Sequence, residues 1–394
     1  MPFRGRGPSE AHGVTDVAAD MDTCDVLIVG GGPAGSTCAW KLRQAGLDAM
    51  VVDAAVFPRD KVCAGWITPQ VVTELDFDVE EYRRGRTFQP ITGFKVGLIG
   101  GRDEISASYG HAVSFGIRRC EFDHYLLQRS GARVKAGTPI ASVRREGGDW
   151  VVNDTIRTPM LVGAGGQFCP VARSMNGPVN AAPLVVAQEA EFAIDDDLGG
   201  TWAIEGELPE LYFCRDLKGY GWCVRKGAYL NVGLGRLDRQ ELPAASARLV
   251  AFLRTRRKIP SNASWRWRGH AYALYESGRR RVVDSGVMLA GDAAGLAYPQ
   301  SGEGIRPAIE SGLLAAATII EAHGEYSMSR LASYEERLRS RFAQGSLSKV
   351  LSPLVALGLK TGLANKLFEV PAFVRHMVLD RWFLHAREPA LTLH

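Results

Sequence analysis

The sequence predicts an α/β protein in which a discontinuous, Rossmann-like domain is assembled from three separated segments and an antiparallel sheet is built from the chain between them. Three observations support this prediction. The chain has 394 residues, which is enough for two intimate domains of roughly 150 residues or more. It contains 44 glycines, well above the usual share of about 7%. Many of them directly follow short apolar runs, where a doubly wound fold needs tight turns.

Composition narrows the class of protein. The chain is 46% hydrophobic and 23% charged, which excludes bulk disorder. Its formal net charge of +4 is too small to indicate nucleic-acid binding, so no nucleic-acid partner is expected. No apolar run reaches the roughly 18 residues of a membrane span. Residues 1–21 are polar and lack the apolar core of a secretory signal, so we interpret them as a flexible tail of a cytoplasmic protein.

The cysteines and histidines do not indicate a metal centre. The seven cysteines form no C-x-x-C pair, and their number is odd. A zinc site, an iron–sulfur cluster and a disulfide framework are therefore not expected. The eight histidines form no H-x-x-x-H pattern. The sequence therefore predicts no metal site and mostly buried thiols in a reducing compartment.

The first glycine cluster lies within a strand–helix–strand pattern. Residues 24–29 form an apolar run typical of a strand buried on both faces. Gly30-Gly-Gly-Pro-Ala-Gly35 follows directly and matches G-x-G-x-x-G. A helix is predicted over residues 36–45 and a second strand over residues 47–52, which ends in Asp53. This order is the βαβ fingerprint of a dinucleotide-binding domain.

Each fingerprint residue has an expected role. Gly30 would allow the tight turn, Gly32 would let the backbone approach a pyrophosphate, and Gly35 would let the helix pack closely on the strand. The helix N-terminus would offer N–H groups to the phosphates. Asp53 is placed to accept hydrogen bonds from ribose hydroxyls and to repel a 2′-phosphate. FAD or NAD is therefore expected here rather than NADP.

Two later glycine clusters are interpreted as returning to the same cofactor. A strand over residues 160–163 runs into Gly163-Ala-Gly-Gly166, and another over residues 287–290 runs into Gly291-Asp292. A long helix opens at residues 302–305. Asp292 would reach a ribityl chain, and the helix N-terminus would face a flavin ring and stabilise the charge that grows on reduction. The alternative is that each cluster is only a strand-to-helix turn.

Five segments resemble a known family. The fingerprint, Arg119-Cys-Glu-Phe-Asp123 and Gly291-Asp292 with its following glycines resemble the p-hydroxybenzoate-hydroxylase-like flavoproteins. Two more segments resemble its geranylgeranyl reductase branch: the loop Arg59-Asp-Lys-Val-Cys-Ala-Gly-Trp66 and the motif Tyr220-Gly-Trp-Cys-Val-Arg-Lys226. The branch has a glycine where this loop has Ala64, and Phe-Pro where this motif has Val224-Arg225. Asn231-Val-Gly-Leu-Gly235 continues the pattern.

The resemblance implies a Rossmann-like FAD-binding domain, an antiparallel-sheet substrate domain and a C-terminal helical region. It places Ala34 and Asp53 at the adenosine-diphosphate half, and Val143 against the cofactor through its backbone. It places Cys63 beside the flavin ring. The cofactor-binding set it implies is Gly30, Gly32, Pro33, Ala34, Gly35, Asp53, Arg59, Cys63, Ala64, Arg119, Val143, Gly165, Gly291, Asp292, Gly302, Gly304 and Ile305. The catalytic set is Cys63, Tyr220 and Trp222.

Cys63 is the most reactive group in the catalytic set. A thiol beside the flavin could relay a proton or contact the reacting carbon. The alternative is a small, inert hydrophobe that fits a turn. Tyr220 and Trp222 alternate along a predicted strand, so they face the same side and could line an apolar cavity. Their alternative is ordinary core packing.

Four basic residues receive structural interpretations. Lys226 and Arg225 could attract an acidic head group, but a solvated hairpin end is the favoured interpretation. Lys61 has the same two interpretations. His270 follows a tryptophan- and arginine-rich run and is expected to satisfy local hydrogen bonds.

The predicted domain boundaries follow these segments. The FAD-binding domain takes residues 22–90, 116–178 and 270–345. The substrate domain takes residues 91–115 and 179–269, with a helix over residues 242–256. Residues 346–394 form a helical cap with Phe368, Phe373, Trp382 and Phe383. This cap could close a lipophilic cavity or touch a membrane surface peripherally, although burial against the body of the protein is favoured.

The expected function is reduction of C=C bonds in an isoprenoid or other hydrophobic small molecule by reduced FAD. Electrons would come from NAD(P)H docking transiently or from a reduced protein partner. A flavin monooxygenase of a hydrophobic aromatic or polyketide compound is the first alternative, because the shared fold does not choose between them. An electron carrier from a flavoprotein to quinone is the second. A halogenase is disfavoured, because Trp265-Arg-Trp267 continues as Arg-Gly.

Overall fold

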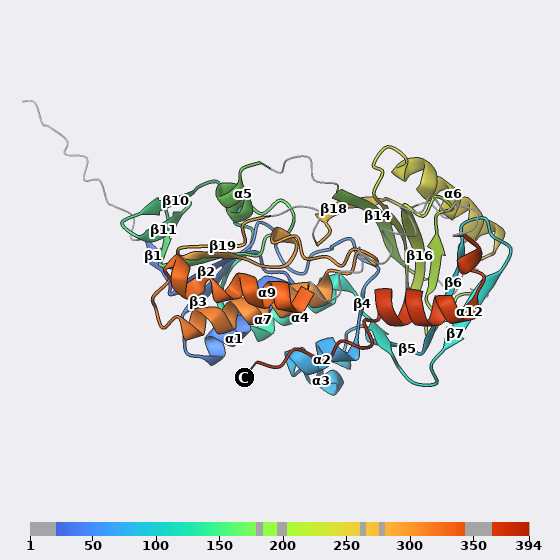
Figure 1. Ribbon diagram of the computed structural model, residues 1–394, viewed down its shortest axis with the longest axis horizontal. Helices are drawn as coiled ribbons and strands as arrows, with labels where there is room; N and C mark the ends of the chain where they lie inside the picture. Colours follow the sequence, from blue (N-terminus) through green and yellow to red (C-terminus); the bar gives the residue numbers. More distant parts are fainter. Residues whose placement is uncertain are drawn as a thin grey trace, which may run out of the picture.

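A computed structural model describes residues 21–178, 184–194, 203–260, 265–275, 280–342 and 365–393. The predicted tail over residues 1–21 lies outside the described residues except for Met21. Two lobes follow one another along the long axis (Figure 1). One lobe carries helices α1, α4, α7 and α9 beneath a parallel sheet, and the other carries a large, mainly antiparallel sheet. Within the described ranges, no helix is long and apolar enough to cross a membrane.

The first lobe is built on a six-stranded sheet. Its strand order is β19-β20-β13-β2-β3-β9, and every neighbouring pair except β19–β20 is parallel. All residues of the central strands β2, β3 and β13 are buried, as expected for a sheet covered on both faces. The strands are β2 (Val26–Val29), β3 (Ala49–Val52), β9 (Arg133–Lys135), β13 (Met160–Gly163), β19 (Val283–Asp284) and β20 (Val287–Leu289).

Two helices from distant parts of the chain pack together against this sheet. They are α1 (Pro33–Gln44) and α7 (Ile305–Glu321). Gly312 makes the contact possible, because a Cβ there would lie 2.4 Å from the carbonyl oxygen of Ala34. The N-termini of both helices therefore lie near one another. The helix α4 (Arg119–Arg129) packs beside α1, and α8 (Met328–Leu331) and α9 (Ser333–Phe342) follow α7.

Two smaller sheets accompany the large ones. A four-stranded sheet has the order β1-β12-β11-β10, and a three-stranded sheet has the order β4-β8-β5. Short helices accompany them: α2 (Pro69–Leu75), α3 (Val79–Arg83) and α5 (Pro170–Asn176). The strands are β1 (Asp22–Thr23), β10 (Val143–Glu146), β11 (Asp149–Val152), β12 (Ile156–Thr158), β4 (Trp66–Ile67), β5 (Gln89–Ile91) and β8 (Ser114–Gly116).

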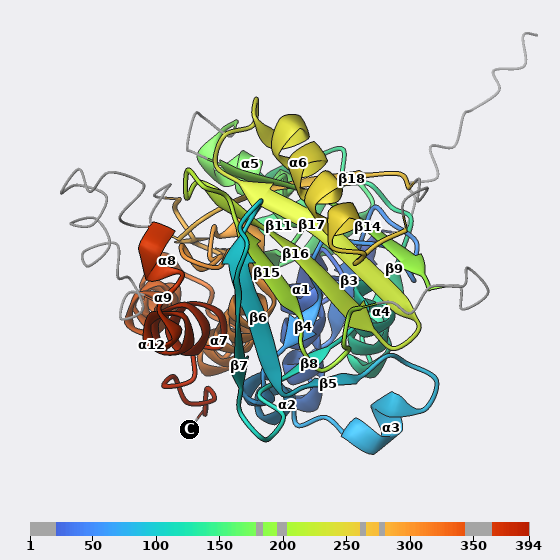
Figure 2. The same ribbon diagram turned by 90° about the vertical axis from the view of Figure 1, so that its right-hand side faces the viewer.

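The second lobe is a seven-stranded sheet of order β18-β14-β17-β16-β15-β6-β7. Figure 2 shows α6 (Leu242–Thr255) lying across its outer face. The inner face carries Phe94, Leu211 and Trp222 and packs against the C-terminal region. The strands are β6 (Gly93–Leu98), β7 (Glu104–Ser108), β14 (Leu184–Ala193), β15 (Glu210–Phe213), β16 (Gly219–Lys226), β17 (Tyr229–Arg236) and β18 (Arg268–Ala273).

The seven-stranded sheet differs from the prediction in one pair of strands. The strands β6 and β15 pair in parallel, so the sheet is not wholly antiparallel. Parallel strands cannot be joined by a hairpin. The chain between β6 and β15 passes through the first lobe. Elsewhere in the fold, Ala332 separates α8 from α9, and β10 begins at Val143.

The C-terminal region is a short α-turn, α12 (Pro371–Phe373), continued by a π-helix, η4 (Val374–Phe383). Phe368, Trp382 and Phe383 are buried against the inner face of the seven-stranded sheet. Burial against the body of the protein is therefore confirmed for these three aromatic residues, while Phe373 is half-buried. The predicted cap also includes residues 346–364, which lie outside the described residues.

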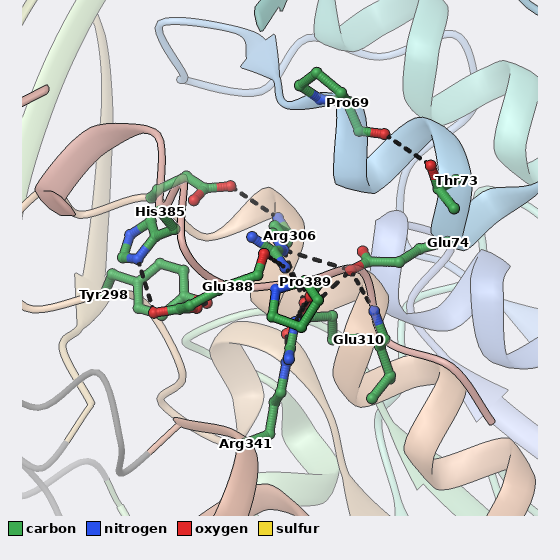
Figure 3. A network of polar contacts seen from close by, with 12 residues as sticks. Pro69, Thr73, Glu74, Tyr298, Arg306, Glu310, Arg341, His385, Glu388 and Pro389 are labelled. Carbon is green, nitrogen blue, oxygen red and sulfur yellow. Dashed lines mark hydrogen bonds and ion pairs between the residues drawn. The ribbon is translucent and has the colours of Figure 1, made fainter. Parts of the chain in front are cut away.

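A buried charge network fastens the last described residues to α7 (Figure 3). Arg306 is fully buried and lies 2.8 Å from Glu310 and 3.4 Å from Glu74. It also donates to the carbonyl oxygens of Glu388 and Pro389, at 3.2 and 2.8 Å. Because Arg306 is the second residue of α7, the C-terminal segment holds the start of that helix in place.

Candidate functional site

The turn between β2 and α1 has the close packing that its glycines predicted. Gly30 has a φ of +115°, and a Cβ there would lie 2.3 Å from the carbonyl oxygen of Ala164. A Cβ on Gly35 would lie 1.9 Å from the carbonyl oxygen of Gly30. Neither position accepts a side chain, so both shape the turn. Gly32 is the N-cap of α1 and has no side-chain capping bond, so it leaves the helix N-terminus open.

Asp53 fixes the same turn from the end of β3. Its carboxylate accepts hydrogen bonds from the backbone N–H groups of Gly31, at 2.7 Å, and Ala55, at 2.8 Å. It also lines a cavity of about 350 Å³ that opens at the N-terminus of α1. An acidic side chain is thus held at one end of this cavity, which we call the cofactor cavity.

A second helix N-terminus meets the cofactor cavity. The N-cap of α7 is Gly304, which has no side-chain capping bond, and the first turn of α7 holds no acidic residue. Gly302 has a φ of +68°, and a Cβ there would lie 2.2 Å from the hydroxyl of Tyr272. Gly291 has a φ of +60° and begins the short 3₁₀ turn η2 (Gly291–Ala293). Two uncapped positive helix ends therefore converge on one cavity.

Most of the predicted site residues line the cofactor cavity. They are Gly32, Pro33, Ala34, Asp53, Arg59, Cys63, Ala64, Arg119, Gly165, Tyr220, Trp222, Gly291, Asp292, Gly302, Gly304 and Ile305. Three predicted residues do not line it. Gly30 and Gly35 pack against neighbouring backbone, and Val143 begins the edge strand β10 and packs against the core of the first lobe.

Two arginines share one buried carboxylate at the cavity wall. Arg119 donates to both oxygens of Asp123, at 2.7 and 2.8 Å. Arg59 lies 3.1 Å from the same carboxylate. One buried negative charge therefore holds two cations at the cavity, which leaves a local excess of positive charge. This arrangement suits a phosphate-bearing ligand.

Lys61, His270 and Asp292 form a cluster that the sequence did not indicate. Nζ of Lys61 lies 2.8 Å from Nε2 of His270, and that nitrogen lies 3.4 Å from Oδ2 of Asp292. Burial opposes ionisation of Asp292, but its hydrogen bond to His270 and the charge of Lys61 lower its pKa to about 2. Burial lowers the pKa of His270 and of Lys61. The predictions of local bonding for His270 and of a solvated position for Lys61 are therefore wrong.

The loop that carries Cys63 is held by hydrogen bonds from the second lobe. Its backbone N–H donates to Oε2 of Glu189 at 2.6 Å, and its carbonyl oxygen accepts from Nδ2 of Asn231 at 3.2 Å. Gly65 has a φ of +75°, and a Cβ there would lie 2.5 Å from the carbonyl oxygen of Ile117. Burial raises the pKa of the Cys63 thiol. The thiol is thus held, mainly protonated, at the cavity.

Tyr220 and Trp222 form one wall of the cavity. Their ring centroids lie 6.1 Å apart on the inner face of the seven-stranded sheet. Trp222 donates to Oδ1 of Asn231 at 2.6 Å, and its ring covers Gly233, where a Cβ would lie 2.1 Å from an indole carbon. The hydroxyl of Tyr220 donates to the carbonyl oxygen of Ser301. The prediction that both rings face the same side is confirmed.

Lys226 does not lie at a solvated hairpin end. Only 1% of it is exposed, and Nζ lies 2.5 Å from Oε2 of Glu191 and 3.1 Å from the carbonyl oxygen of Ile117. The solvated interpretation is wrong because β14 brings Glu191 to the end of β16. Arg225, by contrast, bonds locally to the carbonyl oxygen of Gly227.

The sequence reasoning also missed Glu189 and Glu191. Both lie on β14 and flank Asn231 of the neighbouring strand β17. A signal was present, because two acidic residues occupy alternate positions of a strand that is apolar apart from them and Gln188. Alternation places both on one face, where a buried strand must supply partners for them.

The cofactor cavity has the features that a flavin adenine dinucleotide requires. A Cβ on Gly32 would lie 3.3 Å from a guanidinium nitrogen of Arg59, so the glycine keeps a narrow passage open beside α1. Two helix N-termini without capping side chains face the cavity, and a helix N-terminus of this kind suits an anionic group. Asp53 and Asp292 place carboxylates, which suit hydroxyl groups, at separate points of the cavity lining. The residues present fit the group.

Comparisons with known proteins identify a dinucleotide-binding domain and related oxidoreductases. Residues 28–80 match the model of the NAD(P)-binding Rossmann-like domain. Menaquinone reductase of Mycobacterium tuberculosis is 31% identical over 323 residues, which cover 75% of this chain and 76% of the relative. Geranylgeranyl diphosphate reductase of Rhodobacter capsulatus is 30% identical over 316 residues, which cover 74% of each chain.

Solved structures share the fold. A geranylgeranyl bacteriochlorophyll reductase-like protein of Thermoplasma acidophilum superimposes with a TM-score of 0.75 at 22% identity, covering 93% of this chain and 98% of the other. A flavin-dependent brominase superimposes with a TM-score of 0.67 at 17% identity, covering 90% and 92%. At these identities the likeness concerns the fold alone, and it spans flavoproteins of different chemistry.

Proposed function

The chain belongs to the geranylgeranyl reductase family of FAD-dependent oxidoreductases, and we propose that it reduces C=C bonds of a polyprenyl or similarly apolar substrate. FAD would lie with its diphosphate at the N-terminus of α1 and its sugar hydroxyls near Asp53 and Asp292. Its ring would lie between α7 and the Cys63 loop. When bound and reduced, it supplies the hydride for this reaction.

The juxtaposition of Cys63 with Tyr220 and Trp222 at one cavity carries the proposal. Cys63 lies more than 150 residues before the strand that carries the two aromatic residues, and all three line the cofactor cavity. The aromatic wall continues into the apolar cluster of the second lobe, because the rings of Tyr220 and Phe383 lie 5.1 Å apart. An apolar chain would find a matching surface here, since burying it removes apolar area from water.

The state of the Cys63 thiol suits proton donation. Reduction of an isolated double bond needs a proton on one carbon as well as a hydride on the other. Burial raises the pKa of this thiol, so it carries its proton at neutral pH. In this role Cys63 acts as a general acid and not as a nucleophile.

The relatives favour a polyprenyl substrate. The geranylgeranyl group and the side chain of menaquinone are both polyprenyl chains, and these compounds appear in the names of the relatives from Rhodobacter and Mycobacterium. A third relative, from Methanothrix thermoacetophila, is named for digeranylgeranylglycerophospholipid. The three head groups differ, so the prenyl chain is the shared element that we propose this cavity binds.

An anaerobic assay tests the proposal. Protein is reconstituted with FAD, reduced with dithionite and mixed with geranylgeranyl diphosphate, menaquinone or an archaeal-type prenyl ether. The masses of the products are then measured by mass spectrometry. We expect a gain of one H₂ for each reduced double bond. Oxygen uptake that depends on NAD(P)H and yields an oxygenated product would instead establish a monooxygenase. A parallel series with NADH, NADPH and a reduced ferredoxin identifies the electron donor.

A cysteine pair provides matched variants for this assay. Cys63→Ser should lower turnover by roughly 10²-fold or more, the usual contribution of a positioned acid, while FAD stays bound. Cys120→Ser changes a second partly buried thiol nearby and should leave turnover within about twofold. Equal turnover in Cys63→Ser and the parent protein would remove Cys63 from the mechanism.

A further inference from the structure

Two carboxylates on β14 have different electrostatic surroundings. Glu189 and Glu191 are two residues apart on one strand, so their side chains lie on the same face. Glu191 forms ion pairs with Lys226, at 2.5 Å, and Arg118, at 2.9 Å. Within the described ranges, no ion pair joins Glu189 to a cation. Lys226 and Arg118 are therefore paired with Glu191 and not with Glu189.

Glu189 instead lies against the backbone of the Cys63 loop. Its Oε2 accepts the 2.6 Å bond from the N–H of Cys63 and a 3.3 Å bond from Nδ2 of Asn231. Only 5% of Glu189 is exposed. The carboxyl group is thus held beside the loop, and its nearest hydrogen-bond donor is the backbone N–H of Cys63.

The surroundings separate the two acids in pKa. Burial raises the pKa of Glu189 to about 7. Burial acts on Glu191 too, but the charge and hydrogen bond of Lys226 outweigh it and hold that pKa below its usual value. Neighbouring acids whose pKa values are pushed apart by their environments are typical of acid–base sites. Glu189 therefore changes its charge near neutral pH, while Glu191 stays ionised.

A second cavity also borders the Cys63 loop. It has a volume of about 330 Å³, and its walls include Cys63, Cys120 and Glu189. Because Cys63 lines both cavities, water and small reagents have a route to the loop that does not pass through the cofactor site.

We infer that Glu189 is a positioning residue that keeps the Cys63 thiol protonated. The inference rests on the proposed function, in which that thiol gives up a proton. A negative charge beside a thiol disfavours the thiolate, so ionised Glu189 opposes loss of the proton as pH rises. Arg119 and Lys226 act in the opposite direction. The charged groups around Glu189 and the loop come from five places in the fold. They are Glu191 on β14, Lys226 on β16, Arg118 at the N-cap of α4 with Arg119 in its first turn, Asp60 and Lys61 in the loop, and Arg266 and Arg268 at the start of β18.

Thiol alkylation tests the inference without any substrate. FAD-loaded parent protein and Glu189→Gln are treated with iodoacetamide between pH 6 and 9, and modification of Cys63 and Cys120 is followed by peptide mass spectrometry. At pH 8.5 we expect Cys63 to react roughly three- to tenfold faster in Glu189→Gln, since one pKa unit is a tenfold change in thiolate. At pH 6, where Glu189 is already neutral, the two rates should agree within about twofold.

Cys120 serves as the internal control. Burial raises its pKa, and Glu121 and Glu191 raise it further, so Glu189→Gln should not change its rate. The matched variant Glu121→Gln should accelerate Cys120 and leave Cys63 unchanged. Equal Cys63 rates at every pH, or the same acceleration at pH 6 and pH 8.5, would overturn the inference.

A measurement on the parent protein covers the case in which Glu189→Gln does not fold. The Cys63 rate should then show a second inflection near pH 7, where Glu189 ionises, and a single inflection would overturn the inference. Neither experiment involves turnover, so failure of the proposed reductase activity and failure of this inference are separate results.

Discussion

The indole nitrogen of Trp222 donates a 2.6 Å hydrogen bond to Oδ1 of Asn231. The amide nitrogen of the same asparagine donates to the carbonyl oxygen of Cys63 at 3.2 Å. The two bonds use opposite ends of one side chain, so Asn231 ties the aromatic wall of the cavity to the loop that carries the thiol. The geometry of the candidate site therefore depends on a residue that does not itself line the cofactor cavity.

The contribution of the Trp222–Asn231 hydrogen bond to the free energy of unfolding should be measurable in a double-mutant cycle. Asn231→Leu leaves the indole N–H and the Cys63 carbonyl without a partner, and should cost about 2–3 kcal/mol of unfolding free energy. Trp222→Phe removes the indole N–H and leaves Oδ1 of Asn231 without this donor. Because both variants lose the same bond, the double variant should cost about 1 kcal/mol less than the two single costs added together. Urea denaturation measures all four proteins, and strict additivity would contradict this contribution.

Alanine substitutions at two glycines of the fingerprint should have different effects, one on folding and the other on FAD binding. Gly35→Ala places a methyl group 1.9 Å from the carbonyl oxygen of Gly30, so we expect little folded protein. Gly32→Ala meets only a flexible guanidinium, at 3.3 Å, so the protein should fold and lose FAD. Circular dichroism measures folding, and the ratio of flavin to protein absorbance measures retention. Full flavin content in Gly32→Ala would contradict the placement of the diphosphate.

Asp292 should contribute stability only above acidic pH. Hydrogen bonding to His270 and the charge of Lys61 outweigh burial and lower its pKa to about 2, from the 3.8 of an unfolded chain. A group with a lowered pKa stabilises the fold above its unfolded pKa, and this contribution is lost as pH falls through 3.8 toward 2. Asp292→Asn should therefore cost about 2 kcal/mol at pH 6 and clearly less at pH 3.

Urea denaturation of both proteins between pH 3 and pH 6 checks this prediction. Asp284→Asn is a control, because that residue also lies near the end of a strand but is more exposed and pairs with Arg281 at the surface. A cost for Asp292→Asn that does not change with pH would show that its charge is not the stabilising feature.

Removing the last ten residues should weaken the start of α7. A chain that ends at Leu384 loses the carbonyl groups of Glu388 and Pro389 that accept from Arg306. It also loses the N–H of Leu391 that donates to Glu74. We expect a loss of about 4.5 kcal/mol or more, since three hydrogen bonds to charged groups are lost and each contributes roughly 1.5–3 kcal/mol. A chain that ends at Leu391 keeps these bonds and should unfold at the parent's midpoint.

Local patterns predicted the strand–glycine–helix units of the first lobe. The turn at Gly30–Gly35 and the helix start at Gly304 depend on residues that are neighbours in the chain, so the sequence alone carries their signal. The alternation of Tyr220 and Trp222 is likewise a property of one strand. These features could be recognised without knowing what lies beside them.

Partners of buried charges could not be predicted in this way. Lys226 is buried because β14 and β16 both pair with β17, which places Glu191 opposite Asn231 and brings it to Lys226. His270 meets Asp292 because β18 lies at the edge of the second sheet, against the first lobe. Both contacts depend on how strands and lobes are placed relative to one another. The alternating acids of β14 indicate that partners are needed, but nothing local in the chain identifies those partners.

The discontinuous first lobe has a consequence for synthesis. Asp53 and Ile305, which line the same cavity, are separated by about 250 residues of sequence. A ribosome adding roughly 5–20 residues per second needs about 12–50 s to cover that distance. During this interval the nascent chain contains only the part of the cofactor cavity that precedes α7. Capture of the cofactor is therefore a late event in the life of each new molecule, and it depends on the flavin available when α7 emerges.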